Sequence, residues 1–312
     1  MTLQTDKNHW SEYWRNGRLT PFDHLPNYQG ATATFWEQQF KRLTRNARVL
    51  DVCSGNGAIA LLAQQYSERI NGAFDISAVD AADIDPTQIT LNSPEFQPFI
   101  RAINYIRNTR LEELDTGGEP YDLVTSQYGV EYTNLDESAK RMRTLLKTGG
   151  HFAVVTHTPE SIVVKAAKHH VEDFALLSKA GLFTFEDKLR KRDYLRRRFI
   201  RELDTILSVV YEGFESRRSP LLGQIGEALE PFCKLDTERY FESVKMFIGM
   251  CESLRHHRSR QQDLVRAAEA LKGQQVWYTP FVGQGFELMD SGEIVEEKEQ
   301  VLVGRHYCFK VR

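Results

Sequence analysis

The chain has 312 residues, of which 41% are hydrophobic and 27% are charged, and its formal net charge at pH 7 is -3. This composition predicts a globular protein with enough apolar residues for one large domain or for a domain with a cap, and it argues against a disordered chain. No apolar run approaches the roughly 20 residues that span a bilayer, and the polar N-terminus lacks the apolar region of a signal peptide. We therefore expect a cytoplasmic protein.

The four cysteines are dispersed along the chain, at Cys53, Cys233, Cys251 and Cys308, and no two of them form a Cys-x-x-Cys pair. This spacing argues against a set of disulfides and against a structural zinc site. We expect no bound metal.

Residues 1–46 are rich in aromatic side chains, and we expect them to form a helical and aromatic cap segment. Aromatic residues in such a segment more often pack than contact a substrate. The aromatic residues are Trp10, Tyr13, Trp14, Phe22, Tyr28, Phe35 and Trp36.

The most informative stretch joins a buried strand, residues 48–53, to a turn with Gly55 and Gly57 and then to a helix-forming run at 58–63. Glycines let the backbone approach a ligand closely, and the start of a helix offers unpaired N–H groups. The order of strand, turn and helix predicts a site for a ligand the size of a nucleotide. The same order also fits an ordinary turn of another doubly wound fold.

An acid, Asp51, precedes the glycines. A carboxylate there would repel a pyrophosphate, but it suits a ligand with a positive charge and hydroxyl groups, such as S-adenosylmethionine. The run from Leu50 to Gly57 resembles motif I of the class I S-adenosylmethionine-dependent methyltransferases, which has a glycine at the place of Cys53. A negative φ at Cys53 would accommodate this change. The resemblance implies cofactor contacts from Asp51, Cys53, Ser54, Gly55, Asn56 and Gly57.

The second strand is expected at residues 76–83, which places Asp83 at the carboxyl end, where ligands bind in open α/β sheets. The run resembles motif II of the same family, which implies that Asp83 accepts the ribose hydroxyls and that Ile84 borders the cofactor. We expect Asp80 to lie inside the strand or to point to its other face, and Asp85 to cap the helix after it. The sequence distance from Gly57 to Asp83 implies an extended loop around residues 66–75.

Two later segments complete the expected cofactor site. Asn108 and Thr109 stand where the family has an acid and a small residue beside the adenine, although they could also be plain turn residues. An amide can still accept from the adenine amino group and donate to a ring nitrogen. The run at 121–132 resembles motif IV, which implies cofactor contacts from Gln127 and Tyr128.

Strand and helix patterns alternate through residue 157, which predicts a doubly wound, mostly parallel sheet. The resemblance implies seven strands in the order 3-2-1-4-5-7-6, with the last strand antiparallel. A helix at 135–146 and a glycine turn at 147–150 precede strand five at 151–157. The other strands are expected at 103–107, 285–289 and 306–311, so that residues 47–158 form the S-adenosylmethionine-binding core and residues 276–312 complete its sheet.

Residues 159–275 read as helices inserted between strands five and six. Such insertions generally form a cap in the family, so we expect a lid over the substrate. Five basic residues fall within an arc of about 120° on one expected helix face, which could attract phosphate or an acidic substrate, although a solvated face explains them as well. They are Arg190, Lys191, Arg197, Arg198 and Arg201.

Candidate catalytic residues are expected at the carboxyl ends of strands four and five. The methyl group of a sulfonium is already activated, so alignment of the acceptor can suffice. Where a base is needed, Glu131 suits the orientation of a substrate or the uptake of its proton, and His157, with an ordinary pKa near 6.5, suits a general base if it faces the pocket. Tyr128 and Tyr132 qualify by location, and each of the four could instead be structural.

The segment Ser126-Gln127-Tyr128-Gly129 narrows the substrate. It is not the Asn-Pro-Pro-Tyr run of the DNA adenine enzymes, and it lacks the Pro-Cys nucleophile that cytosine C5 methylation needs. We therefore expect transfer of a methyl group from S-adenosylmethionine to a small molecule, most readily by O- or N-methylation. The alternatives are an RNA methyltransferase that uses the basic insertion and a non-catalytic S-adenosylmethionine-binding protein. The sequence leaves the oligomeric state open.

Overall fold

The computed structural model describes residues 7–20, 27–115, 117–191, 194–234, 238–272, 276–296 and 300–312. The chain divides into two compact units. The first, which we call the sheet unit, comprises Met1–Lys165 and Asp263–Arg312, and the second, the helical unit, comprises Ala166–Gln262. Among the described residues, no helix is both long enough and apolar enough to cross a membrane.

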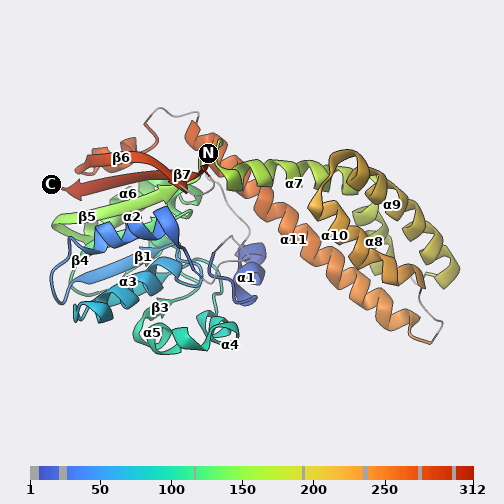
Figure 1. Cartoon of the computed structure of the whole chain (residues 1–312), viewed down its shortest axis with the longest axis horizontal. Coiled ribbons are helices and arrows are strands. Elements are labelled where there is room, and N and C mark those ends of the chain that lie inside the picture. Colours follow the sequence, from blue (N-terminus) through green and yellow to red (C-terminus); the bar gives the residue numbers. More distant parts are fainter. Residues whose placement is uncertain are drawn as a thin grey trace. The chain divides into compact units, whose positions relative to one another are not determined.

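The sheet unit contains a seven-stranded sheet in the order β3-β2-β1-β4-β5-β7-β6 (Figure 1). Neighbouring strands from β3 to β5 pair in parallel, and β7 is antiparallel to both β5 and β6. The fold class and strand order predicted from the sequence are confirmed. The strands are β1 (Arg48–Val52), β2 (Asp75–Val79), β3 (Asn104–Ile106), β4 (Tyr121–Gln127), β5 (Leu146–Thr156), β6 (Phe286–Glu296) and β7 (Val301–Val311).

Apolar side chains on both faces of the sheet explain why the central strands read as continuous hydrophobic runs. On β1, Val49 belongs to the core cluster that contains Trp36 and Phe40, and its neighbour Leu50 belongs to the cluster that contains Phe152. Successive residues of a strand point to opposite faces, so one strand supports both cores. The helices of this unit are α1 (Lys7–Arg15), α2 (Gly30–Phe40), α3 (Ala58–Arg69), α4 (Ile89–Asn92), α5 (Gln97–Ala102), α6 (Leu135–Leu145) and α12 (Thr279–Gly283).

Several expected boundaries are wrong. The strands expected at 285–289 and 306–311 are longer in the structure, because β6 and β7 pair with each other from Phe286 to Glu296. Strand or helix pairing explains three others. The parallel ladder between β1 and β2 ends at the pair Val52 and Val79, so β2 stops four residues before Asp83. The helix α3 continues to Arg69 with Tyr66 and Ser67 buried, which leaves a connection shorter than the expected loop. The expected glycine turn at 147–150 lies within β5, which begins at Leu146 where that residue pairs with Tyr121.

The helical unit has a hydrophobic core of its own, with Phe185, Phe199 and Phe247 fully buried. Gly181, at a φ of 90°, separates its first two helices, a conformation that favours glycine. Pro220 begins a later helix after Ser219, whose hydroxyl accepts from the N–H of Leu222. The helices are α7 (Ile162–Lys179), α8 (Leu182–Lys191), α9 (Arg196–Arg217), α10 (Pro220–Leu229) and α11 (Tyr240–Lys272), of which α7 and α11 carry residues of both units.

Candidate cofactor site

A cavity of about 370 Å³ lies in the sheet unit, beyond the carboxyl ends of the first four strands. In an open α/β sheet this is the edge where ligands bind. The residues that line it follow β1, β2, β3 and β4 in the chain or belong to α1. They are Trp10, Trp14, Cys53, Val79, Asp80, Ala81, Ala82, Thr109, Arg110, Leu111, Glu112, Tyr128, Gly129, Tyr132, Thr133 and Asn134.

The glycine turn after β1 reaches the cavity through Cys53, whereas Ser54, Gly55, Asn56 and Gly57 do not line it. We call the turn from Cys53 to Gly57 the floor. Gly55 and Gly57 have φ values of 53° and 83°, and the N–H of Gly57 donates to the carbonyl of Ser54 at 2.9 Å. Cys53, which lines the cavity, has a φ of 53°. The negative φ that would accommodate Cys53 is not found: the residue keeps the left-handed backbone that suits glycine, at a cost of about 1–2 kcal/mol.

Asp51 is buried beneath this floor and does not itself line the cavity. Its carboxylate accepts from the Thr125 hydroxyl at 2.9 Å and from the N–H of Ala60 at 3.3 Å, so it joins β1 to β4 and to the first turn of α3. Burial raises its pKa to about 7, although the two hydrogen bonds act in the opposite direction. Asp51 thus fixes the strand and helix between which the turn is held.

Asp80, the first residue after β2, brings a carboxylate to the cavity. It accepts from the N–H of Gly55 at 2.7 Å and from the N–H of Ala82 at 2.7 Å, which ties the ends of β1 and β2 together. Asp83 does not line the cavity: its side chain is 41% exposed and pairs with Arg15 at 2.6 Å, which lowers its pKa. The expectation that Asp80 lies inside the strand is wrong, because β2 ends at Val79.

The other expected cofactor residues divide in the same way. Thr109 lines the cavity, whereas Asn108 has a φ of 53° and donates to Asp83 at 3.5 Å. Ile84 is buried in the protein. The Gln127 side chain accepts from the indole N–H of Trp36 at 2.7 Å, so it joins the end of β4 to α2.

Helix α1 supplies an aromatic wall through Trp10 and Trp14. The Asn56 side chain donates to the carbonyls of Trp14 and Arg18 at 2.7 and 2.8 Å, so the glycine turn itself holds α1. A methyl group on Gly55 would lie 2.4 Å from the Trp14 ring. The sequence offered one sign of this wall, two indoles four residues apart on one helix face. Phe22 lies outside the described residues.

Of the candidate catalytic residues, Tyr128 and Tyr132 line the cavity, whereas Glu131 and His157 are buried and do not line it. Tyr128 lines it with a φ of 54°, and its ring stacks on His157 with centroids 4.3 Å apart. Glu131 is 3% exposed, and one carboxylate oxygen accepts from the backbone N–H of His157 at 2.9 Å. Burial raises the pKa of Glu131 to about 7 and lowers that of His157 to about 3. Glu131 therefore suits proton uptake near neutral pH better than His157 does.

Comparison with known proteins places this site in a family. The model of a family described as a methyltransferase domain matches residues 26–203, more than half of the chain. The chain belongs to the methyltransferase domain family. With the order of the sheet, this confirms the class I methyltransferase predicted from the sequence, an enzyme class whose cofactor is S-adenosylmethionine. No protein with a curated description matches the chain.

Solved structures of methyltransferases match the chain at low identity. The methyltransferase CcbJ from Streptomyces caelestis is 17% identical over 51% of this chain and 60% of its own, with a TM-score of 0.37. An S-adenosylmethionine-dependent methyltransferase from Mesorhizobium loti is 20% identical over 41% and 54%, with a TM-score of 0.32. A putative sarcosine dimethylglycine methyltransferase from Galdieria sulphuraria is 12% identical over 89% and 84%, with a TM-score of 0.37. The chain thus spans little more than half the length of the first two proteins.

The cavity of this methyltransferase fits its cofactor. A carboxylate at the end of β2 can accept ribose hydroxyls, and the segment around Thr109, next along the sheet edge, can border the adenine. The indoles of Trp10 and Trp14 offer aromatic faces that attract a sulfonium cation. Among the described residues, no group of three or more His, Cys, Asp or Glu side chains could hold a metal ion.

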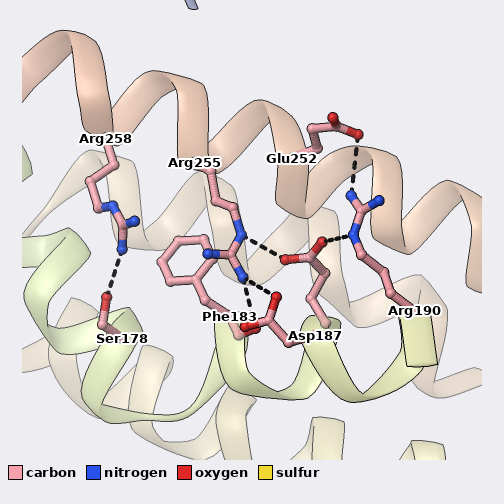
Figure 2. Close-up of polar contacts among 8 residues, drawn as sticks. Ser178, Phe183, Asp187, Arg190, Glu252, Arg255 and Arg258 are labelled. Carbon is pink, nitrogen blue, oxygen red and sulfur yellow. Dashed lines mark hydrogen bonds and ion pairs between the residues drawn. The ribbon is translucent and has the colours of Figure 1, made fainter. Parts of the chain in front are cut away.

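Several basic residues of the methyltransferase's helical unit form ion pairs, some of which Figure 2 shows. Arg190 contacts Glu186 and lies 3.2 Å from Glu252. Arg255 contacts Asp187 at 2.8 Å and lies over the ring of Phe183, with 4.9 Å between the guanidinium carbon and the ring centroid. The expected single basic face is wrong, because α8 ends at Lys191 and α9 begins at Arg196, which divides the five residues between two helices.

Proposed function

We propose that this methyltransferase transfers a methyl group from S-adenosylmethionine to a small-molecule acceptor by O- or N-methylation. The observation that carries the proposal is the size of the cavity at the strand ends. Trp10 and Trp14 of α1 line it, and its volume is about 370 Å³, which suits small molecules. S-adenosylmethionine supplies a methyl group that its sulfonium already activates. The task of the chain is to bind the acceptor and to align it.

The geometry supports a specific set of cofactor contacts. We assign the ribose hydroxyls to Asp80 in place of Asp83, because Asp80 lines the cavity and Asp83 is engaged by Arg15 outside it. The adenine then lies beside Thr109 and its neighbours. Cys53 and the floor of the glycine turn border the methionine portion.

Two features support proton transfer to Glu131 when the acceptor carries a proton that must leave. Its carboxyl is held in place by the N–H of His157, and its burial keeps the pKa near the pH of the cell. The stack of Tyr128 on His157 orients the adjacent wall of the cavity. His157 serves in this proposal as a support of that wall.

The RNA alternative has less support in the structure. RNA binding relies on cations that can neutralise phosphates. Arg198 and Lys188 both pair with Glu202, and Arg190 pairs with Glu186 and Glu252. The role of residues 159–275 as a substrate lid stays a prediction.

Methyl-labelled S-adenosylmethionine separates these functions. The purified chain is incubated with it and with either a small-molecule extract or bulk tRNA, and the label is followed into each fraction. The proposal expects label in small molecules and none in tRNA. Label in tRNA would favour the RNA enzyme, and cofactor binding without transfer to any fraction would favour a non-catalytic protein.

A further inference from the structure

Aromatic rings line part of the cavity. Trp10 packs edge-on against Tyr132, with ring centroids 5.6 Å apart, and lies nearly parallel to Trp14 at 6.5 Å. Tyr128 adds a third element of this wall through its stack on His157. Aromatic faces attract cations, and the attraction grows when water is excluded.

Carboxylates surround the same region. Asp80 and Glu112 line the cavity, and Glu131 lies between the lining residues Gly129 and Tyr132 in the chain. The thiol of Cys53 responds to this field: burial raises its pKa, and Asp80, Glu112 and Glu131 raise it further. Arg110 lines the cavity as well, so two lining carboxylates, those of Asp80 and Glu112, stand against one lining cation, which favours a cationic ligand over an anionic one.

Three buried polar atoms beside the aromatic wall have no hydrogen-bond partner within the part of the chain that the structure describes. They are the second carboxylate oxygen of Glu131, the hydroxyl of Tyr132 and Nδ1 of His157. An unsatisfied buried polar group costs about 1–3 kcal/mol. Tyr132 lines the cavity, Glu131 precedes it in the chain, and His157 stacks on the lining residue Tyr128, so a ligand in the cavity is suited to bring partners to these atoms.

We propose that the methyl acceptor is a primary or secondary amine that enters as an ammonium ion, with the aromatic wall around its cation and Glu131 as the acceptor of its proton. This proposal rests on the function proposed above and names the substrate class of the same site.

The step balances in atoms and charge. The ammonium N–H proton passes to the Glu131 carboxylate, which leaves a lone pair on nitrogen. That lone pair forms the N–C bond to the methyl group while the S–C bond breaks and its electron pair stays on sulfur. The products are a methylated ammonium ion, S-adenosylhomocysteine and a protonated Glu131, which returns its proton to solvent.

A phenol is the other methyl acceptor that a base could activate, and the residues around the cavity disfavour its ionisation. The pKa values of Tyr28, Tyr128 and Tyr132 all lie above the ordinary value for tyrosine, chiefly because burial disfavours the phenolate. Glu131 raises all three further. A substrate phenol would meet the same two effects, and both disfavour its anion. For an ammonium ion the two effects oppose each other: the carboxylates hold the cation, and burial lowers its pKa and eases loss of the proton.

Calorimetry with matched probes tests the amine proposal. Benzylamine and benzyl alcohol are titrated separately into the complex of the full chain with S-adenosylhomocysteine. We expect the amine to bind at least about tenfold more tightly, a difference of about 1.4 kcal/mol. In Glu131→Gln, whose amide oxygen can still accept from His157, we expect this preference to vanish while the Kd of S-adenosylhomocysteine changes little. Glu113→Gln makes the same charge change at an exposed position and should keep the preference.

The outcomes separate the two proposals. Equal binding of the two probes, no binding of the amine, or an intact preference in a folded Glu131→Gln protein overturns the amine proposal. If labelled methyl groups reach phenols or alcohols and not amines, the amine proposal fails while the function proposed above stands. If S-adenosylhomocysteine itself does not bind, both fail. Thermal melting confirms that each variant is folded, and partial recovery of the preference in Glu131→Asp would support the role of the carboxylate.

Discussion

The floor and the wall of the cavity are built in different ways. The floor is backbone: the turn from Cys53 to Gly57, held by hydrogen bonds from Gly55 to Asp80 and from Gly57 to Ser54. The wall is made of side chains such as Trp10 and Tyr132. Substitutions alter backbone contacts little, so the floor suits a ligand that stays the same, the cofactor. Substitutions do alter side chains, so the wall is the part of the fold that can adapt to different acceptors.

The largest expected effect lies where floor and wall meet. Gly55→Ala places a methyl group 2.4 Å from the Trp14 ring, at a φ of 53° that only glycine adopts without strain. We expect a loss of about 2–4 kcal/mol in the free energy of unfolding, from backbone strain and overpacking together. Urea denaturation measures it.

A matched control is Gly283→Ala in α12, where an added methyl group meets nothing within 4 Å. It should change stability by no more than about 1 kcal/mol, in the stabilising direction. The Gly55→Ala loss should shrink in the double variant with Trp14→Ala, because the collision with the ring is gone. A Gly55→Ala protein as stable as the wild type would contradict the close packing of the Trp14 ring on Gly55.

The second effect concerns proton transfer at the wall. For an acceptor that loses a proton, Glu131→Gln should lower kcat/KM about 100-fold, at the lower end of general-base effects. In the wild type, kcat/KM should rise as pH increases through about 7, because the carboxyl is protonated below that pKa and cannot take a proton. A pH profile that keeps this rise in Glu131→Gln would contradict the role of Glu131.

The same pKa has a consequence for stability. Since the pKa of Glu131 is raised in the folded state from 4.5 to about 7, the folded protein prefers the protonated carboxyl. This contribution to stability is fully present below about pH 4.5 and is lost as pH rises through 7. The Glu131→Gln protein should lack this loss when unfolding is measured across that range.

A third effect tests how the floor holds the wall. Asn56→Ala removes two hydrogen bonds to the carbonyls of Trp14 and Arg18, and we expect a loss of about 1–3 kcal/mol. Hydrogen exchange should become faster in α1 and stay unchanged in β4. Asn16→Ala, which removes one exposed hydrogen bond to Glu12, should do neither.

The smallest effect concerns the floor alone. Cys53→Gly should raise the free energy of unfolding by about 0.5–1 kcal/mol, because relief of the left-handed strain exceeds the entropy cost of glycine. Cys53→Ala keeps the Cβ atom and should bring no such gain. Thermal melting of the two variants side by side decides the matter, and equal melting temperatures would show that Cys53 is not strained.

The sequence predicts the floor of the cavity better than its wall. The strand, glycine turn and helix around Gly57 are local, so their pattern predicted the fold and the family. The end of β2 depends on its pairing with β1, and for that reason the sequence alone places Asp83 at the strand end, where the structure has Val79 followed by Asp80. The wall depends on α1 meeting segments more than a hundred residues away, as in the contact of Trp10 with Tyr132. Periodicity within one segment carries no information about such a contact.

The central claim, that S-adenosylmethionine binds at the strand ends with Asp80 on its ribose, is tested most directly by calorimetric titration of S-adenosylhomocysteine into two matched variants. Asp80→Asn and Asp83→Asn remove the same charge three residues apart. The account predicts a Kd raised at least about tenfold in Asp80→Asn and within about twofold of the wild type in Asp83→Asn. The reverse order, or a wild type that binds neither S-adenosylmethionine nor S-adenosylhomocysteine, would contradict it.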